Sequence, residues 1–209
     1  MITTIRNARP VFLFPLTLRW CEMVQAVRPL RADAARNRAR LLEIAYQTFA
    51  AEGLSVPIDE IARRAGVGAG TVYRHFPTKE DLFRAVVEER ISSIVDDGRA
   101  LLSSQNPGQA LFTFVRSMVL QWGAADHGLV DALAGLGIDI NEAVPDAEAA
   151  FLGLVGDLLA AAQKAGTVRA DVDVRDVKAI VVGCQAMQAY TPEAADRLLE
   201  VVLDGLRPR

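Results

Sequence analysis

Apolar side chains recur along this chain at the spacing typical of helices. In residues 33–51 they fall three to four positions apart and form one stripe, made of Leu41, Leu42, Ala45 and Phe49. Alternation of period two is almost absent, and glycine and proline are sparse in the long Ala-, Leu-, Val-, Arg- and Glu-rich stretches. The pattern therefore predicts an all-α protein.

The breaks between the apolar stretches divide the chain into further helices. Gly53 is placed to end the first helix as a C-terminal cap, and Pro57 suits the first position of the next. Thr78 is typical of an N-cap, and Asp81 three residues later completes an approximate capping box. After the helix of 33–51 we expect helices over residues 57–65, 69–75, 79–104, 108–122, 128–137, 145–165, 173–190 and 192–206.

The two short helices before residue 79 have the pattern of a helix-turn-helix unit. Ala62 is small enough for a second helix to cross closely, and Gly66 provides the positive φ of a sharp turn. Val72 returns an apolar side chain to the seam, opposite Ile58 and Ile61. Such a unit presents the N-terminal residues of its second helix to base edges in the major groove.

The sequence between Arg36 and Arg90, about a quarter of the chain, resembles the TetR family of transcriptional regulators. The matching residues are Ile61-Ala62, Ala65-Gly66-Val67, Gly70-Thr71-Val72-Tyr73, His75-Phe76 and Lys79-Glu80-Asp81-Leu82. Pro57 and the segment of residues 74–78 are most similar to the SbtR-like branch. The resemblance implies a three-helix DNA-binding domain, here residues 31–78. It also implies a larger helical ligand-binding and dimerisation domain, here residues 79–209.

The expected DNA contacts follow from the helix-turn-helix geometry, from the resemblance and from its departures. They are Arg36, Asn37, Ser55, Pro57, Ala69, Gly70, Thr71, Tyr73, Arg74, His75 and Lys79. Among them, Arg36, Asn37 and Ser55 are expected to make backbone contacts in place of a hydroxyl and a lysine that the family often has and this chain lacks. Tyr73, His75 and Lys79 resemble phosphate contacts of the family, and we expect the Tyr73 ring to be buried with its hydroxyl at the DNA backbone. Phe76 is expected in the core. Gly68 and Ala69 stand where the family often has Ser-Lys, and Val56 stands where it has Thr, so base reading here would depend on methyl contacts and DNA shape.

Bulky apolar residues of the second half suit both a core and an effector cavity. Core filling is the commoner use of any one of them. The expected cavity residues are Phe112, Met118, Trp122, His127, Phe151 and Gln185. The helices over 145–165 and 173–190 are apolar on several faces, which favours burial in a four-helix dimer interface as in the family. The expected interface residues are Phe151, Leu154, Leu158, Val181 and Met187.

Charge and reactive side chains narrow the function further. Residues 1–90 hold 14 Lys/Arg against 10 Asp/Glu, whereas residues 91–209 hold 9 against 16, within a net charge of −3. A basic N-terminal part suits a phosphate-facing surface, although solvated helices give the same bias. The two cysteines and two histidines lack metal-ligand spacing, and we expect no metal, no cofactor and no catalytic residue. The adjacent Asp126 and His127 form no catalytic constellation by adjacency alone.

Residues 1–30 differ from the rest and are expected to be a leader that is disordered or not native. Their apolar run over 11–18 is too short and too proline-broken to cross a bilayer, and no small-residue cleavage site follows it. We expect Met23 to be the natural start and the protein to be cytoplasmic, without a membrane partner.

Taken together, the sequence predicts a one-component transcriptional regulator. The expectation is a homodimeric repressor, released from a palindromic operator of double-stranded DNA by a small, largely apolar effector. A helical small-molecule-binding protein without specific operator binding is the alternative, and an enzyme is a more remote one.

Overall fold

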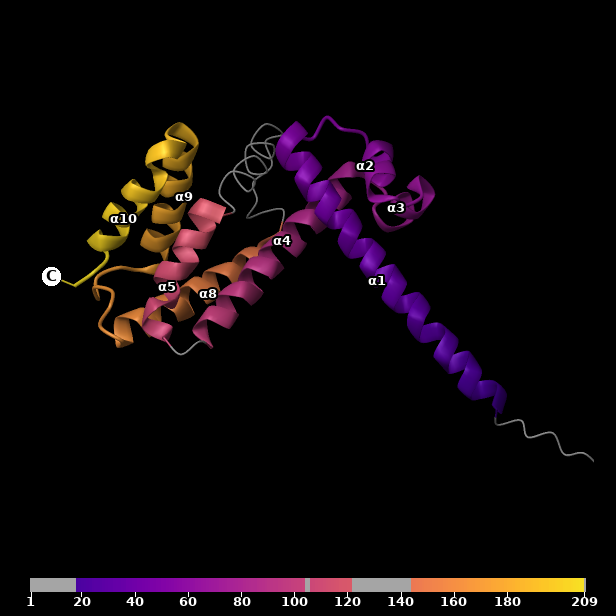
Figure 1. The fold of residues 1–209 in the computed structure, drawn as a ribbon, viewed down its shortest axis with the longest axis horizontal. Helices are drawn as coiled ribbons and strands as arrows, with labels where there is room; N and C mark the ends of the chain where they lie inside the picture. Colours follow the sequence, from indigo (N-terminus) through magenta and orange to yellow (C-terminus); the bar gives the residue numbers. More distant parts are fainter. Residues whose placement is uncertain (1–17, 104–105, 122–143, 209) are drawn as a thin grey trace, which may run out of the picture. The chain divides into compact units, whose positions relative to one another are not determined.

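The computed structural model describes residues 18–103, 106–121 and 144–208, and every regular element within those ranges is helical (Figure 1). The elements are α1 (Leu18–Glu52), α2 (Ile58–Ala65), α3 (Ala69–His75), α4 (Lys79–Leu102), α5 (Pro107–Arg116), the π-helical segment η1 (Ser117–Gln121), α8 (Pro145–Lys164), α9 (Val174–Tyr190), the 3₁₀ turn η2 (Pro192–Ala194) and α10 (Ala195–Gly205). The all-α prediction is thus confirmed. The helix predicted over 128–137 lies outside the described residues.

Helix α1 contains the boundary between two compact units, residues 1–39 and 40–209. In the first unit the helix begins at Leu18, well before the predicted start near Asp33. Residues before Asp33 such as Met23 and Gln25 favour the helical state, and the helix continues through Pro29, which removes one backbone donor.

The N-terminal core of the second unit is built around the predicted helix-turn-helix. The apolar stripe of α1 packs against α2, α3 and the start of α4, and its members are Leu41, Leu42, Ala45 and Phe49. The Phe49 ring tilts against the Phe83 ring of α4, with centroids 5.6 Å apart. Ile61 and Val72 are fully buried between α2 and α3, so the predicted seam is confirmed.

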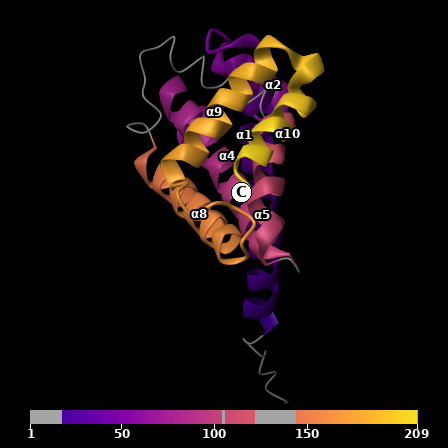
Figure 2. The ribbon, with the colours of Figure 1, turned by 90° about the vertical axis from the view of Figure 1, so that its left-hand side faces the viewer.

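A second core joins α4, α5, η1, α8, α9 and α10. Phe112, Phe114, Leu158 and Leu199 are among its fully buried side chains. An ion pair holds α5 to α10: the Arg116 guanidinium donates to both carboxylate oxygens of Glu200, at 2.7 and 2.8 Å. The C-terminal helices therefore pack around one shared core, which Figure 2 shows from the side of α9 and α10.

Helix α8 contacts both cores. Along its length it packs against α4, where a Cβ at Gly98 would lie 2.4 Å from Leu154 Cδ2, so the two helices cross closely because position 98 has no side chain. Val144, the residue before α8, is 2% exposed and packs in the N-terminal core, and Ala147 lies against that core. The two cores are consequently joined by α8 as well as by α4.

Within the described part of the chain, no helix combines the length and the apolar content needed to cross a bilayer.

Candidate DNA-binding surface

The turn between α2 and α3 follows from two residue choices. Gly66 adopts φ 66°, and its N–H bonds back to the carbonyl oxygens of Ala62 and Arg63, which ends α2 as predicted. Val67 donates to the Ala62 carbonyl oxygen at 3.0 Å, so the chain turns sharply at the end of α2. Ala62 is 1% exposed beneath this turn. The short helix α3 is thereby fixed at its N-terminal end.

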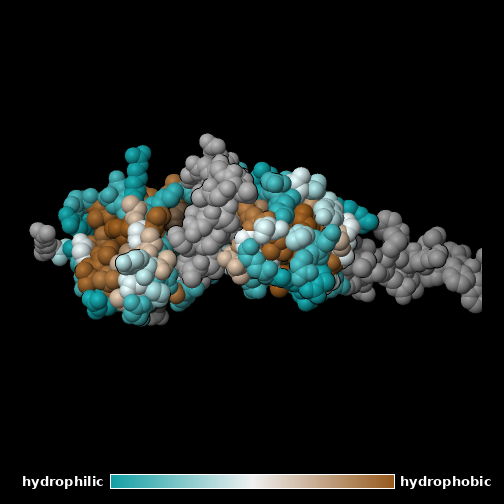
Figure 3. Space-filling view, turned by 90° about the horizontal axis from the view of Figure 1, so that it is seen from above, coloured by the Kyte–Doolittle hydropathy of each residue, from teal (hydrophilic) through white to brown (hydrophobic). Residues whose placement is uncertain are grey.

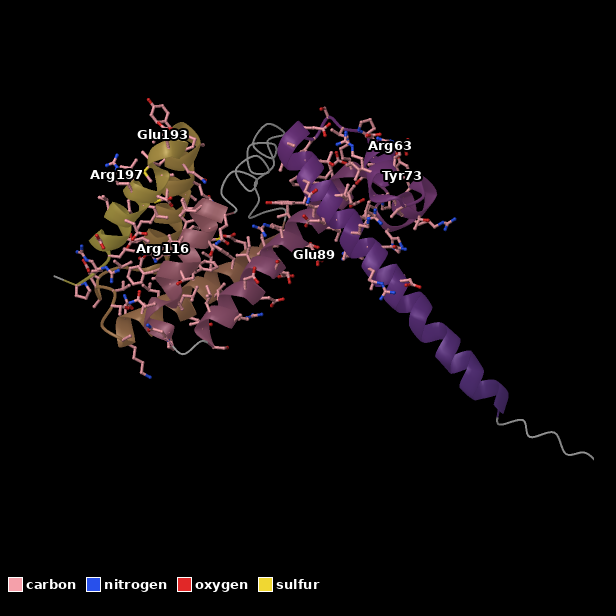
Figure 4. The ribbon with its side chains drawn as sticks, viewed as in Figure 1. Arg63, Tyr73, Glu89, Arg116, Glu193 and Arg197 are labelled. Atoms are coloured by element: carbon pink, nitrogen blue, oxygen red, sulfur yellow. The ribbon has the colours of Figure 1, made fainter. Side chains whose placement is uncertain are left out.

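Helix α3 is buried on one side only. Val72 and Phe76, four positions apart, face the core, and the prediction that Phe76 is a core residue is confirmed. Thr71, Arg74 and His75 are exposed. Tyr73 is 43% exposed, so the expectation of a buried ring was wrong (Figure 4). Its position lies about 100° around the helix from Val72, which turns the ring away from the seam.

The other predicted DNA contacts differ in exposure. Gly70 and Ser55 are exposed, and Ala69 is half-buried. Pro57 is exposed and extended, and it is the N-cap of α2, which begins at Ile58, one residue after the predicted start. Arg36 and Asn37 are exposed in the first unit, where Arg36 donates to the Asp33 carboxylate.

Helix α2 carries a network of charges beside the recognition unit. Glu60 accepts from Arg63 and from Arg64, each at 2.8 Å, and Arg64 also reaches Glu52 at the end of α1. These bonds lower the pKa of Glu60 to about 2, chiefly through the hydrogen bond from Arg63. Arg63 extends outward in Figure 4. The network ties α2 to α1 and holds the two arginines in place.

The start of α4 is fixed by side-chain bonds. The capping box predicted for Thr78 and Asp81 is present in both directions, with the Asp81 N–H donating to Thr78 Oγ1 at 3.1 Å. Lys79 is half-buried, and its ammonium donates to the carbonyl oxygen of Leu54 at 2.8 Å. Sequence reasoning missed this partner, because the two residues are 25 positions apart and no pattern links them.

Some of the predicted cavity residues lie in the C-terminal core, and others lie outside the residues that the structure describes. Phe112 and Met118 are buried in the C-terminal core, and Phe151 lies at its edge with 9% exposure. Gln185, singled out as an unusual polar residue in an apolar run, donates from Nε2 to the Met118 carbonyl oxygen in η1 at 3.1 Å. Trp122 and His127 lie outside the described residues.

Most residues predicted for the dimer interface pack inside the protomer instead. Phe151, Leu154, Leu158 and Val181 are at most 9% exposed, and Met187 is half-buried. They fill the core because helices α8 and α9 each turn their largest apolar side chains toward α4, α5 and η1. The exposed faces carry small residues instead: Ala149, Gly153 and Ala160 on α8, and Ala179, Gly183 and Ala186 on α9.

A groove of about 670 Å³ lies between α8 and α9 on that exposed side. Leu152 and Val182 line it, and Val182 is 56% exposed. Lys178 pairs with Glu148 across the groove. Apolar side chains also gather over the C-terminal helices on the face that Figure 3 shows.

The side chains that the structure describes include neither a metal-binding cluster nor an exposed cysteine. No group of three His, Cys, Asp or Glu side chains within them could hold a metal ion. Cys184 is buried in the C-terminal core, and burial raises the pKa of its thiol, which makes it less nucleophilic at neutral pH.

This fold, a small helix-turn-helix unit joined to a larger helical layer system, defines a class of DNA-binding regulators, and comparison with known proteins agrees. Residues 41–86 match the tetR family of bacterial regulatory proteins, and residues 106–208 match the C-terminal domain of SbtR-like transcriptional regulators. A TetR transcription regulatory protein from Mycobacterium vanbaalenii is 62% identical, with a TM-score of 0.73 over 86% of this chain and 100% of that one. A TetR transcriptional regulator from Streptomyces coelicolor is 34% identical, with a TM-score of 0.68 over 82% of this chain and 98% of that one.

The chain therefore belongs to the TetR family of transcriptional regulators, with an SbtR-like C-terminal domain, and it is not an enzyme. It is also 39% identical over 105 residues to an HTH-type transcriptional regulator of Staphylococcus aureus; that match covers 50% of this chain and 57% of the relative. The aligned part is thus little more than half the length of that relative. The prediction of a TetR-type, DNA-binding regulator from the residue pattern is confirmed.

Proposed function

We propose that the protein is a homodimeric repressor that binds a palindromic operator and is released by a small, largely apolar effector. The observation that carries the proposal is the exposure of one side of α3, with Thr71, Tyr73, Arg74 and His75 on a helix whose other side is fixed by Val72 and Phe76. A rigid short helix with polar and basic side chains outward is suited to the major groove. In a symmetric dimer two such helices read half-sites about 34 Å apart.

In this proposal the exposed side chains have separate tasks. Thr71 offers a hydroxyl and a methyl group to base edges, whereas Tyr73, Arg74 and His75 contact phosphates. Gly70 lets the backbone approach the DNA, and the methyl group of Ala69 is available to thymine. Ser55 and Pro57 lie near the start of α2, and Ser55 donates to the DNA backbone there. Arg36 and Asn37 add contacts from α1.

Dimerisation is assigned to the exposed faces of α8 and α9. Their small residues recur every three to four positions, which lets a second pair of helices approach closely, and Leu152 and Val182 add apolar area. Four helices packed in this way would cover the groove. Residues 31–78 then form the DNA-binding domain and residues 79–209 the effector and dimerisation domain.

Effector control is assigned to the C-terminal core around Phe112, Met118, Phe151 and Gln185, with Trp122 and His127 added from outside the described residues. A ligand there changes DNA affinity only through its different affinity for two conformations, commonly about 1–3 kcal/mol of coupling. Helix α4, which begins in the DNA-binding core and packs on α8, would transmit the change by tilting. Since α8 also enters the DNA-binding core through Val144, it would move with α4.

Selection of a binding sequence from a random duplex library, followed by sedimentation of the complex, tests the proposal. We expect the purified full chain to enrich a palindromic sequence and to bind it as a dimer. Enrichment of no sequence, or binding as a single protomer, would refute it. Release of that duplex by members of a library of apolar small molecules tests the effector part separately.

A further inference from the structure

Lys79 occupies an unusual place for a lysine. It is the first residue of α4, where the helix dipole disfavours a positive charge. The side chain is half-buried, and its ammonium is directed to the Leu54 carbonyl oxygen at 2.8 Å. That contact supplies the negative partial charge that the helix terminus does not.

Leu54 lies in the turn between α1 and α2, which is attached to its surroundings at two other points. Gly53 donates to the Phe49 carbonyl oxygen at 3.0 Å, which ties the turn to α1. Val56 is 8% exposed and anchors the turn in the N-terminal core. Lys79 adds a hydrogen bond from α4 to the Leu54 carbonyl oxygen, and this bond is called the Lys79–Leu54 tie below. The turn is thus held by both α1 and α4.

The tie has consequences for the residues next to Leu54. Ser55 and Pro57 are exposed on the same turn, and Pro57 sets the first hydrogen bonds of α2, through the N–H groups of Glu60 and Ile61. The Lys79 end of the tie is rigid because the capping box of Thr78 and Asp81 fixes the first turn of α4. A fixed Lys79 therefore fixes the start of α2 relative to α4.

We propose that Lys79 is a positioning residue for DNA binding. It holds the α1–α2 turn in place relative to α4, and its ammonium group binds a carbonyl oxygen of the protein instead of a DNA phosphate. The inference rests on the proposed DNA-binding surface and changes the role that the family resemblance implies for this lysine. When α4 tilts, this tie moves the turn with it.

Salt dependence of DNA binding separates the two roles. Each phosphate that a lysine or arginine neutralises contributes about 0.9 to the slope of log affinity against log salt, whereas a hydrogen bond inside the protein contributes none. The full-length protein, Lys79→Met, Lys79→Arg and Arg74→Met would be titrated by fluorescence anisotropy against the duplex selected with the wild-type chain. The wild-type titration tests the proposed function by itself, and the variants test the inference.

We expect Lys79→Met to lower affinity about fivefold to tenfold at constant salt, the size of one ordinary hydrogen bond, with an unchanged slope. Lys79→Arg, which keeps a cationic donor, should retain most of the affinity. Arg74→Met should reduce the slope by about 0.9. A comparable loss of slope in Lys79→Met, or wild-type affinity in that variant, would overturn the inference.

Hydrogen exchange of the free protein gives a second measurement that needs no DNA. Loss of the tie should speed exchange of the amides of residues 54–61 in Lys79→Met, with the melting temperature little changed and the amides of α10 unaffected as an internal control. Exchange at the wild-type rate in the turn would also overturn the inference.

Discussion

The close crossing of α4 and α8 offers a quantitative test of the packing between the two cores. A Cβ at position 98 would lie 2.4, 3.0 and 3.1 Å from Leu154 Cδ2, Cδ1 and Cγ, whereas carbon atoms pack best at about 3.5–4.0 Å. Leu154 is 3% exposed, so its side chain has no open space into which to turn. Gly98→Ala should therefore overpack the crossing.

The expected magnitudes follow from that geometry. Overpacking costs about 1–3 kcal/mol, and alanine recovers about 1 kcal/mol of helix propensity, so Gly98→Ala should destabilise the protein by about 0–2 kcal/mol. Leu154→Ala alone should cost about 2–5 kcal/mol through lost burial and a cavity. In the double variant the new Cβ enters the space that the leucine vacates. The double variant should then be more stable than the sum of the single effects by about 1–3 kcal/mol.

Denaturant unfolding followed by circular dichroism, at one fixed protein concentration, measures all four forms of this cycle. Gly205→Ala is a matched control, because a Cβ there would meet nothing within 4 Å. It should be neutral or slightly stabilising. Additive single effects, within about 0.5 kcal/mol, would refute the argument that the missing side chain at position 98 sets the distance between α4 and α8.

Three further predictions concern DNA contact, assembly and acid stability. Tyr73→Ala should weaken binding of every duplex to a similar extent and leave the salt slope unchanged, because its neutral hydroxyl releases no counterion, whereas Thr71→Ala should change the selected sequence; equal effects of both on all duplexes would contradict the division of tasks. Val182→Glu should yield monomers in sedimentation, while the control Val201→Glu, at a similarly exposed position (63% against 56%), should stay dimeric; a dimer in both would exclude this face. Because the pKa of Glu60 is lowered from 4.5 to about 2, its stabilising contribution is full above pH 4.5 and lost as pH falls toward 2. The difference in melting temperature between wild type and Glu60→Gln should shrink over that range, and a constant difference would rule the pairing out.

Local signals in the sequence were sufficient for the helix-turn-helix. Gly66, Thr78 and Asp81 act through backbone φ and bonds within a few residues, so their consequences can be derived without the rest of the molecule. The stripe of α1 behaves in the same way, because helix geometry alone brings Leu42, Ala45 and Phe49 to one face. These features are local in sequence and therefore predictable.

Which side of a helix faces the core was less predictable where both sides are apolar or amphipathic. Helices α8 and α9 carry apolar residues on several faces, and only the positions of α4, α5 and η1 decide that Leu158 and Val181 turn inward while Val182 remains exposed. Tyr73 is a similar case, because its ring suits either burial or solvent and the packing of Val72 settles its direction.

The sequence by itself determined the helical class, the turn at Gly66 and the exposed basic helix that follows it, because each depends on neighbours within about one or two turns. Only the tertiary structure decided that Lys79 meets Leu54, that Gly98 admits Leu154, and that Val144 enters the DNA-binding core. Each of these joins residues 25 or more positions apart. Such pairs depend on how whole helices cross, and no local propensity or periodicity encodes a crossing.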